Sequence, residues 1–213
     1  MLISKSKQLL VEGVDDRGAV IGLMKHHVEW ADNKWPVFID AVGSVEEILD
    51  KAYLNTKLKE SGLEILGVMI DADDKPDSRW EHIHSICQPL FPSLPDALPK
   101  GGLVVDGPTG LRFGLWMMPD CESSGMLESF LRYMVPTHAE PLWNHAKSSF
   151  AGAKAIGSSC RDAHVDKAHI HTWLAWQDPP GERLGIAITK KMLDPQASTA
   201  APFVNWFREL YRV

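Results

Sequence analysis

The sequence predicts an α/β protein in which a central, mainly parallel sheet has helices on both faces and a helical C-terminal part follows. Three observations support this prediction. Apolar strand-like runs alternate with segments of helical period up to residue 71, which is the pattern of βαβ units. The runs are almost continuously apolar, as expected of strands that are buried on both faces. The last third of the chain is mainly helical in pattern, and no linker separates it from the rest.

The first βαβ unit is predicted within residues 7–43. The run KQLLVEG at 7–13 predicts a short strand that ends in a turn at Gly13. Apolar residues then recur at a helical period over 15–30. The run WPVFIDAVG at 35–43 predicts a second buried strand.

Residues 44–71 continue this alternation. Ser44 followed by Glu47 has the spacing of a capping box, which marks the start of a helix predicted over 44–61. Gly62 is expected to end that helix. The run LEILGVMID at 63–71 then predicts a third strand, apolar up to its acidic end.

The remaining elements are assigned from the same patterns. We expect a helix at 78–91, a proline-rich loop at 92–102, strands at 102–107 and 111–120, and helices at 125–135, 138–153, 161–177 and 201–213. Together these elements predict a single domain over residues 1–213. Its core sheet and acidic site would lie in 1–135, and 136–213 would form a helical C-terminal extension.

Composition narrows the function classes. The chain is 45% hydrophobic and 23% charged, which is typical of a globular protein. No apolar run approaches the roughly 18 residues of a membrane span, and the N-terminal run is too short for a signal peptide. We therefore expect a cytoplasmic protein without a membrane partner. The net charge of −6 argues against a generally basic nucleic-acid coat, although residues 147–213 are basic on balance and suit phosphate contacts.

Acidic side chains follow three of the predicted strands. The carboxyl ends of parallel strands share one edge of a sheet, so we expect these side chains to converge. Carboxylates that lie close together repel one another unless protons or a cation compensate, and hard oxygen ligands suit Mg²⁺ or Mn²⁺. The candidate metal ligands at these strand ends are Glu12, Asp16, Asp71, Asp73, Asp120 and Glu128. A single acid at a strand end more often caps a helix or lies in a solvated turn, but acids after three strands favour a shared cation.

Two of these segments resemble motifs of a known domain. LLVEGVDD resembles the first motif of the TOPRIM domain of topoisomerases, primases and OLD-family nucleases, and GVMIDADD resembles the second, an apolar strand that ends in D-x-D. Three further segments resemble those of a small stand-alone TOPRIM-like family related to the OLD nucleases. They are GLWMMPDCESSGMLESFL, KAHIHTWLAWQDPPGERLG and FVNWFREL. The resemblance covers most of the chain. It implies a Rossmann-like fold and a Mg²⁺ or Mn²⁺ site for phosphodiester chemistry on DNA, with RNA as the alternative substrate.

The resemblance also implies roles for the acids. It matches Glu12 to the first-motif glutamate, a metal ligand or general acid/base, and Asp71 and Asp73 to the D-x-D metal ligands. Asp16 matches an extra acid of the OLD branch that helps to hold a second ion. Asp120 and Glu128 match acids in the segment GLWMMPDCESSGMLESFL, where they would act as ligands of the second ion.

A lysine near the scissile phosphate would stabilise charge in the transition state. The resemblance favours Lys167, and Lys190 and Lys191 are the alternatives.

The chain has no GxxxxGK[ST] motif, the phosphate-binding loop of many ATPases, whereas in OLD nucleases the TOPRIM region is joined to an ATPase region. This difference implies a separate ATPase partner. A homodimer is left open.

Two functions from different classes remain. The first is a Mg²⁺-dependent endonuclease or nicking enzyme that hydrolyses phosphodiester bonds with two metals. The alternative is a catalytically silent TOPRIM-fold module that regulates a partner or binds nucleic acid. A phosphatase of the haloacid dehalogenase type is disfavoured, because its D-x-D belongs on the first strand. We expect the paired histidines of the two HIH segments to be structural or at the surface, and Cys121 to serve packing. The tryptophans Trp173, Trp176 and Trp206 are expected in the core rather than as platforms for base stacking.

Overall fold

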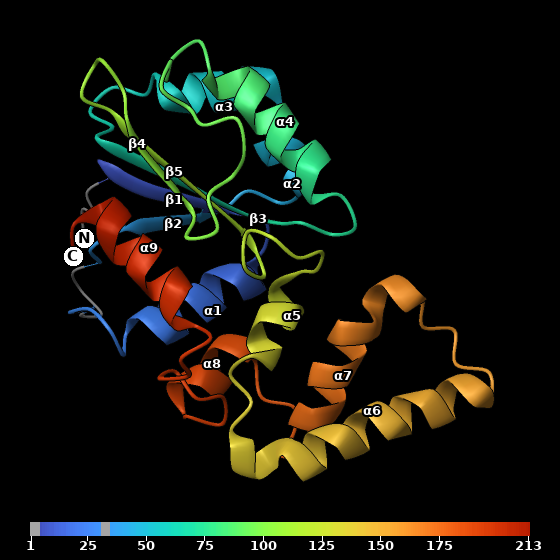
Figure 1. The fold of residues 1–213 in the computed structure, drawn as a ribbon. Coiled ribbons are helices and arrows are strands. Elements are labelled where there is room, and N and C mark those ends of the chain that lie inside the picture. The colour runs from blue at the N-terminus through green and yellow to red at the C-terminus, as the bar shows by residue number, and fades with distance from the viewer. Residues whose placement is uncertain (1–4, 31–34) are drawn as a thin grey trace.

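The mixed α/β fold is confirmed by the computed structural model, which describes residues 5–30 and 35–213 (Figure 1). The central sheet has five strands in the order β2-β1-β3-β5-β4. β1, β2, β3 and β5 are parallel, and β4 pairs antiparallel with β5 at the edge. The strands are β1 (Lys7–Val11), β2 (Phe38–Ala41), β3 (Ile65–Asp71), β4 (Leu103–Asp106) and β5 (Arg112–Met118).

The helices alternate with these strands and then dominate the C-terminal part. The α-helices are α1 (Val14–Met24), α2 (Val45–Ile48), α3 (Lys51–Leu58), α4 (Pro76–Cys87), α5 (Leu127–Arg132), α6 (Glu140–Ala155), α7 (Val165–Leu174), α8 (Leu184–Thr189) and α9 (Ala201–Tyr211). Two 3-10 turns, η1 (Thr137–Ala139) and η2 (Asp162–His164), precede α6 and α7.

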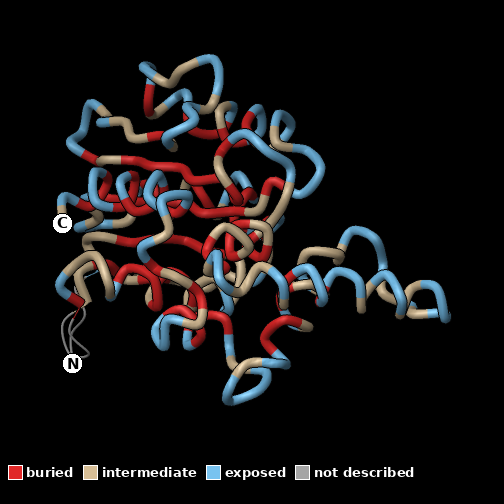
Figure 2. Tube along the Cα trace, turned by 60° about the horizontal axis from the view of Figure 1, so that its bottom comes forward, coloured by how far each residue is buried: buried red, intermediate tan, exposed pale blue. Residues whose placement is uncertain are grey.

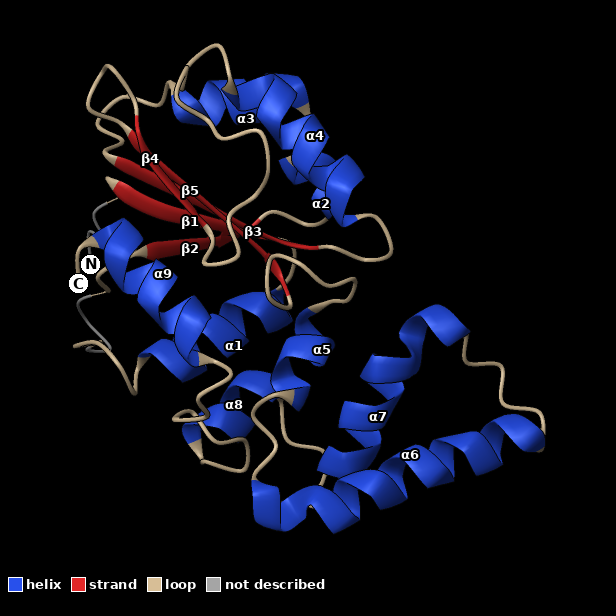
Figure 3. Cartoon of the chain, viewed as in Figure 1, coloured by secondary structure: helices blue, strands red, loops and turns tan. Residues whose placement is uncertain are grey.

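Helices cover both faces of the sheet (Figure 3). α2, α3 and α4 lie over one face, and α1 and α9 lie over the other. α6 and α7 pack on each other and project from the body as an arm, and their outer surface is largely exposed (Figure 2). The buried residues therefore concentrate in the sheet and its flanking helices, which explains why the central strands are almost continuously apolar.

The last helix belongs to this core rather than to the arm. α9 packs against β3, β4 and β5, and it crosses β3 and β5 where they present no side chain, because Gly67 and Gly114 are paired in register. A Cβ at Gly67 would lie 2.2 Å from the hydroxyl of Tyr211, and one at Gly114 would lie 2.5 Å from Leu210. The buried Tyr211 hydroxyl donates to the carbonyl of Gln8 at 2.7 Å, so the end of the chain is fixed to the first strand.

Some predicted elements differ in detail from the structure. The helix expected over 44–61 is two helices, because the chain turns at Asp50, whose carboxylate accepts the N–H of Tyr53 at 2.8 Å and begins α3. The helix expected over 15–30 ends at Met24. Trp176 is 42% exposed and stacks on His145, so its assignment to the core was wrong.

α1 and α8 approach each other unusually closely at glycines. A Cβ at Gly185 in α8 would lie 2.1 Å from the carbonyl oxygen of Gly18, and one at Gly22 would lie 2.3 Å from the carbonyl oxygen of Gly185. Such distances leave no room for any side chain, so the backbones themselves are in contact. Because α1 begins at the edge of the sheet where the acidic residues lie, this contact also fixes the helix that carries Asp16.

We predict that Gly185→Ala lowers the free energy of unfolding by about 1–3 kcal/mol, as overpacking of a close contact typically does. Urea denaturation would measure it. Gly152→Ala is the matched control, since Gly152 is also helical and nothing lies within 4 Å of its Cβ position. The control should gain about 0.5–1 kcal/mol from helix propensity. Equal effects at the two sites would contradict the close contact.

Candidate functional site

The candidate site lies at the carboxyl edge of two neighbouring strands. Glu12 comes directly after β1 and Asp71 ends β3, and these strands are paired in parallel. The Glu12 carboxylate accepts the backbone N–H of Asp71 through Oε1 at 2.8 Å. The two acids expected to meet at one edge of the sheet are therefore adjacent, and their positions follow from strand pairing alone.

The segment between β5 and α5 is fastened to the end of β3. Asp73 and Gly125 exchange two backbone hydrogen bonds, of 2.8 and 2.7 Å. Asp71 then accepts the N–H of Leu127, the first residue of α5, through Oδ1 at 2.9 Å. These contacts place the following residue, Glu128, beside the strand ends.

Asp16 and Glu128 complete the cluster from two helices. Asp16 lies in the first turn of α1, where its Oδ2 accepts the N–H of Gly13 at 2.9 Å. Glu128 is only 4% exposed, although it is a glutamate. Repulsion from Glu128 acts on both Asp16 and Asp71, so the four carboxylates share one electrostatic environment.

Burial and mutual repulsion raise the pKa values of three of these acids. Loss of solvation is the largest cause in each case and raises the pKa of Glu12 to about 7, of Asp16 to about 6 and of Asp71 to about 9. Repulsion adds to this effect, most strongly the effect of Glu12 on Asp71. The backbone N–H donors of Asp71 and Gly13 act in the opposite direction on Glu12 and Asp16. At neutral pH Asp71 therefore keeps its proton and Glu12 is about half protonated, because the surroundings do not stabilise the full negative charge of the cluster.

The donor chemistry of the cluster fits a hard divalent cation. Glu12, Asp16 and Asp71 each accept a backbone N–H through one carboxylate oxygen. With Glu128 they offer only oxygen donors, which Mg²⁺ and Mn²⁺ prefer. No three His, Cys, Asp or Glu side chains in the described part of the chain are already arranged as a ligand set, so these carboxylates would have to close around an ion.

Lys167 in α7 is the lysine that the structure brings to this cluster. Its Nζ lies 3.2 Å from Oε1 of Glu128, and its charge is also attracted by Asp15 and Asp16. The alternatives lie elsewhere: Lys190 follows α8 and pairs with Glu182 at 2.6 Å, and Lys191 follows it in an exposed left-handed turn.

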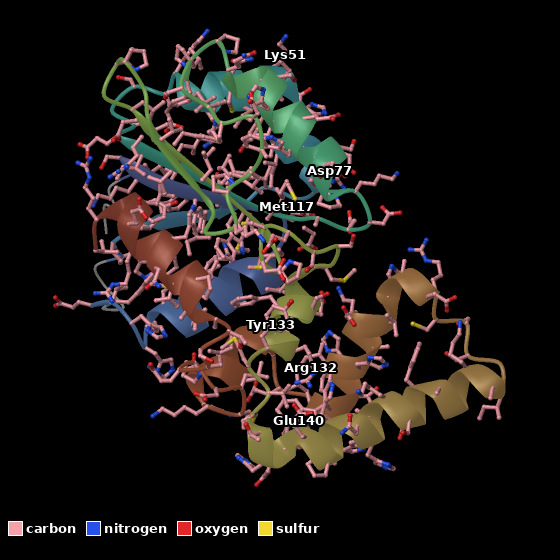
Figure 4. The ribbon with its side chains drawn as sticks, viewed as in Figure 1. Lys51, Asp77, Met117, Arg132, Tyr133 and Glu140 are labelled. Atoms are coloured by element: carbon pink, nitrogen blue, oxygen red, sulfur yellow. The ribbon has the colours of Figure 1, made fainter. Side chains whose placement is uncertain are left out.

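Asp73 and Asp120 point to other partners. Asp73 has a left-handed backbone and its carboxylate pairs with Arg79 of α4 at 2.8 Å, although its charge still repels Glu12 and Asp71. Asp120 accepts hydrogen bonds within its own turn and from the hydroxyl of Tyr133, labelled in Figure 4, at 2.9 Å. Hydrogen bonds lower the pKa of Asp120, against the effect of burial. It is not among the charges that act most strongly on Glu12, Asp16 or Asp71.

Three residues near the site were not predicted from the sequence. Arg79 attracts the negative charge of both Asp73 and Glu12. The hydroxyl of Ser129 in α5 donates to Asp166 in α7, and it also accepts the N–H of Met126 at 3.1 Å. The sequence gave one hint of these residues, the position of Asp166 beside Lys167. It gave none of Arg79 and Ser129, because nothing in the sequence indicates which helices face each other.

A cleft of about 600 Å³ opens beside the cluster, between the loops that follow β3 and β5 and the start of α7. Its lining combines acidic and polar side chains with the apolar Met126, Ala163 and Val165, and it adjoins the cluster through the Asp73–Gly125 contact. The lining residues include Asp73, Asp74, Ser124, Ser129, Asp162 and Asp166.

In the described part of the chain, histidine and cysteine side chains form no alternative metal site. His84 packs against Trp80, and His169 lies between Trp143 and Phe150. Cys121 is buried, and burial raises the pKa of its thiol to about 12, which keeps it a thiol at neutral pH.

Comparison with known proteins gives a family without an assigned chemistry. A family model described as "Protein of unknown function (DUF3226)" matches residues 6–212, which is nearly the whole chain. Neither the curated proteins nor the solved structures contain a match. None of the described helices is both long enough and apolar enough to cross a membrane.

We predict that, without divalent cations, stability falls as the pH rises. Because the pKa values of Glu12, Asp16 and Asp71 are higher in the folded chain than in the unfolded chain, the folded state binds more protons between about pH 4 and pH 9. The stability that these protons provide is complete below about pH 4 and is lost as the pH passes through the folded values. Urea denaturation in EDTA from pH 5 to pH 9 would measure this slope.

In the same experiment Asp71→Asn should flatten the slope and be more stable than the parental protein at pH 8 by at least about 1 kcal/mol. Asn keeps the acceptor oxygen for Leu127 and removes the charge. Asp74→Asn is the control, because Asp74 is exposed in the same loop. A parental slope in the Asp71 variant would show that its carboxylate is not the source.

Proposed function

The chain belongs to the DUF3226 family, and we propose that it is a metal-dependent endonuclease or nicking enzyme that hydrolyses phosphodiester bonds in DNA. The proposal joins the resemblance of its motifs to TOPRIM and OLD-family nucleases with the chemistry of the acidic site. Mg²⁺ or Mn²⁺ is the cation that the site would take. RNA as a substrate, a separate ATPase partner, a homodimer and a cytoplasmic location stay predictions.

One observation supports the proposal above all others. Glu12 and Asp71 lie on adjacent parallel strands, are joined by a hydrogen bond of 2.8 Å, and both have raised pKa values. A fold selected for stability alone gains nothing from burying like charges at one point. A bound cation would reverse the sign of this interaction, which is the usual reason for such a cluster at the carboxyl edge of a parallel sheet.

The side chains have distinct roles in this reaction. When bound, Mg²⁺ or Mn²⁺ supplies an activated water and neutralises charge on the leaving oxygen. Asp71 would hold one ion, and Asp16 and Glu128 would hold a second. Glu12 has a pKa of about 7, so it can either donate a ligand oxygen or exchange a proton near neutral pH. Lys167 would face the phosphate and stabilise its developing charge.

The alternative proposal is a module without catalytic activity that regulates a partner or binds nucleic acid. Two observations favour it. Asp73, the second acid of the D-x-D motif, is engaged by Arg79, and Glu128 already has a counter-ion in Lys167. Activity then decides between the two functions, because a pure module would cleave nothing with any cation.

We predict that Mg²⁺ and Mn²⁺ raise the melting temperature of the parental protein by binding its folded state. Glu12→Gln and Asp71→Asn should each remove most of this response, because each change removes a charged ligand and leaves the hydrogen-bonding shape nearly unchanged. Asp74→Asn should respond as the parental protein does. Thermal denaturation with and without about 5 mM of the cation would measure this response. Undiminished stabilisation in both site variants would contradict the assignment.

We predict that the purified chain converts supercoiled DNA to nicked or linear products with Mg²⁺ or Mn²⁺, and that Asp71→Asn abolishes this activity. Lys167→Ala should retain metal binding but cleave about 10²–10³-fold more slowly, as expected when one transition-state donor is lost. Lys190→Ala and Lys191→Ala should affect DNA binding and its salt dependence more than the rate at saturation. Single-turnover cleavage would compare them. Absence of cleavage by the parental protein, alone and with a candidate ATPase, would favour the silent module.

A further inference from the structure

Lys167 holds a position in the acidic site that its side chain is able to leave. Its ammonium lies 3.2 Å from Glu128 and close to the charges of Asp15 and Asp16. Its side chain is nevertheless 52% exposed, whereas that of Glu128 is 5% exposed. The carboxylate is thus fixed and buried, and the lysine reaches it from solvent on a flexible stem.

The buried charge of Glu128 needs a partner. An unpaired buried carboxylate is strongly destabilising, and the ion pair with Lys167 is the one that Glu128 makes among the described residues. Asp16 and Asp71 do not help, because their carboxylates repel that of Glu128 whenever they are ionised. Lys167 therefore supplies the positive charge that a divalent cation would supply to the same carboxylate.

The helix that carries Lys167 has an independent anchor. Asp166, its neighbour, accepts a short hydrogen bond from the hydroxyl of Ser129, which is the neighbour of Glu128. α5 and α7 are therefore joined by two adjacent contacts, and one of them does not involve Lys167 or the acidic cluster. Breaking the Glu128–Lys167 pair would release a side chain and leave α7 in place.

We propose that Lys167 is the counter-ion of the acidic cluster in the absence of metal, and that a divalent cation displaces it from Glu128. This inference rests on the proposed metal site and concerns its regulation. An ammonium group and a divalent cation that share one carboxylate repel each other, so the lysine and the metal compete for Glu128. The released ammonium becomes available to a phosphate only when the cation is bound, which couples cation loading to contact with the substrate.

Calorimetric Mn²⁺ titration and thermal denaturation of Lys167→Met would test this competition. Methionine keeps an apolar stem and removes the charge. In EDTA we expect its melting temperature to be lower than parental by at least about 3 °C, because Glu128 is left unpaired. We expect its Mn²⁺ affinity to be about tenfold tighter, since a competing charge has been removed. At saturating Mn²⁺ the two melting temperatures should converge.

Two variants control for effects of the substitution other than the loss of the charge beside Glu128. Lys167→Arg keeps the charge and should retain a near-parental melting temperature in EDTA without tighter Mn²⁺ binding. Lys190→Met is matched in exposure and also breaks an ion pair, with Glu182, and it should leave the Mn²⁺ affinity unchanged. If Lys167→Met fails to fold in EDTA, saturating Mn²⁺ should restore folding, because the ion replaces the missing charge.

Three results would overturn the inference. Parental Mn²⁺ affinity in Lys167→Met, with a melting difference that persists at saturating Mn²⁺, would make Lys167 a structural residue and leave the proposed function standing. Failure of Lys167→Met to fold at any Mn²⁺ concentration would show that metal cannot replace the lysine. Absence of Mn²⁺ binding by the parental protein would remove the proposed metal site together with the displacement.

Discussion

The parallel pairing of β1 with β3 creates the central constraint of this structure. It places Glu12 and Asp71 at one edge of the sheet, within one hydrogen bond of each other. Glu12 follows one buried strand and Asp71 ends the other, and loss of solvation raises the pKa of both carboxyl groups. The surrounding elements therefore have to compensate for concentrated negative charge, and most features of the site follow from that need.

The compensation is shared among backbone and side-chain groups. Backbone N–H groups of Asp71, Leu127 and Gly13 each donate to one carboxylate of the cluster. Positive charge comes from Arg79 on one side and Lys167 on the other. These groups leave the pKa values of the acids raised, so the compensation is incomplete. An incompletely neutralised pocket of oxygen donors is well prepared for a cation and poorly explained as a device for stability.

The C-terminal part serves the sheet in two ways. α9 closes one face by lying across the paired glycines Gly67 and Gly114, and its Tyr211 fixes the end of the chain to β1. α7 carries Lys167 to the acids and is held to α5 by Asp166. The same stretch of sequence therefore contributes both to the core and to the electrostatics of the site.

The sequence by itself determined the fold class, the strands and the acids at their ends. Local patterns suffice for these features, because continuous apolar runs report strands buried on both faces and strand ends follow from them. Hence the adjacency of Glu12 and Asp71 could be predicted from the sequence alone. The break at Asp50 was missed, because the spacing of Val45, Ile48, Leu49 and Ala52 fits one continuous helix. In the structure Ala52 is exposed, and α3 buries Leu54 and Leu58 instead.

Only the tertiary structure decided which acids and which lysine meet. Asp73 turns to Arg79 and Asp120 to Tyr133, although both follow strands as Glu12 does. Lys167 rather than Lys190 reaches the cluster, because α7 packs on α5. Periodicity reports whether a position is buried, but not which distant side chain lies opposite it. Contacts between α5 and α7, or between α1 and α8 at Gly185, depend on how closely whole helices approach, and that distance is set by packing in three dimensions.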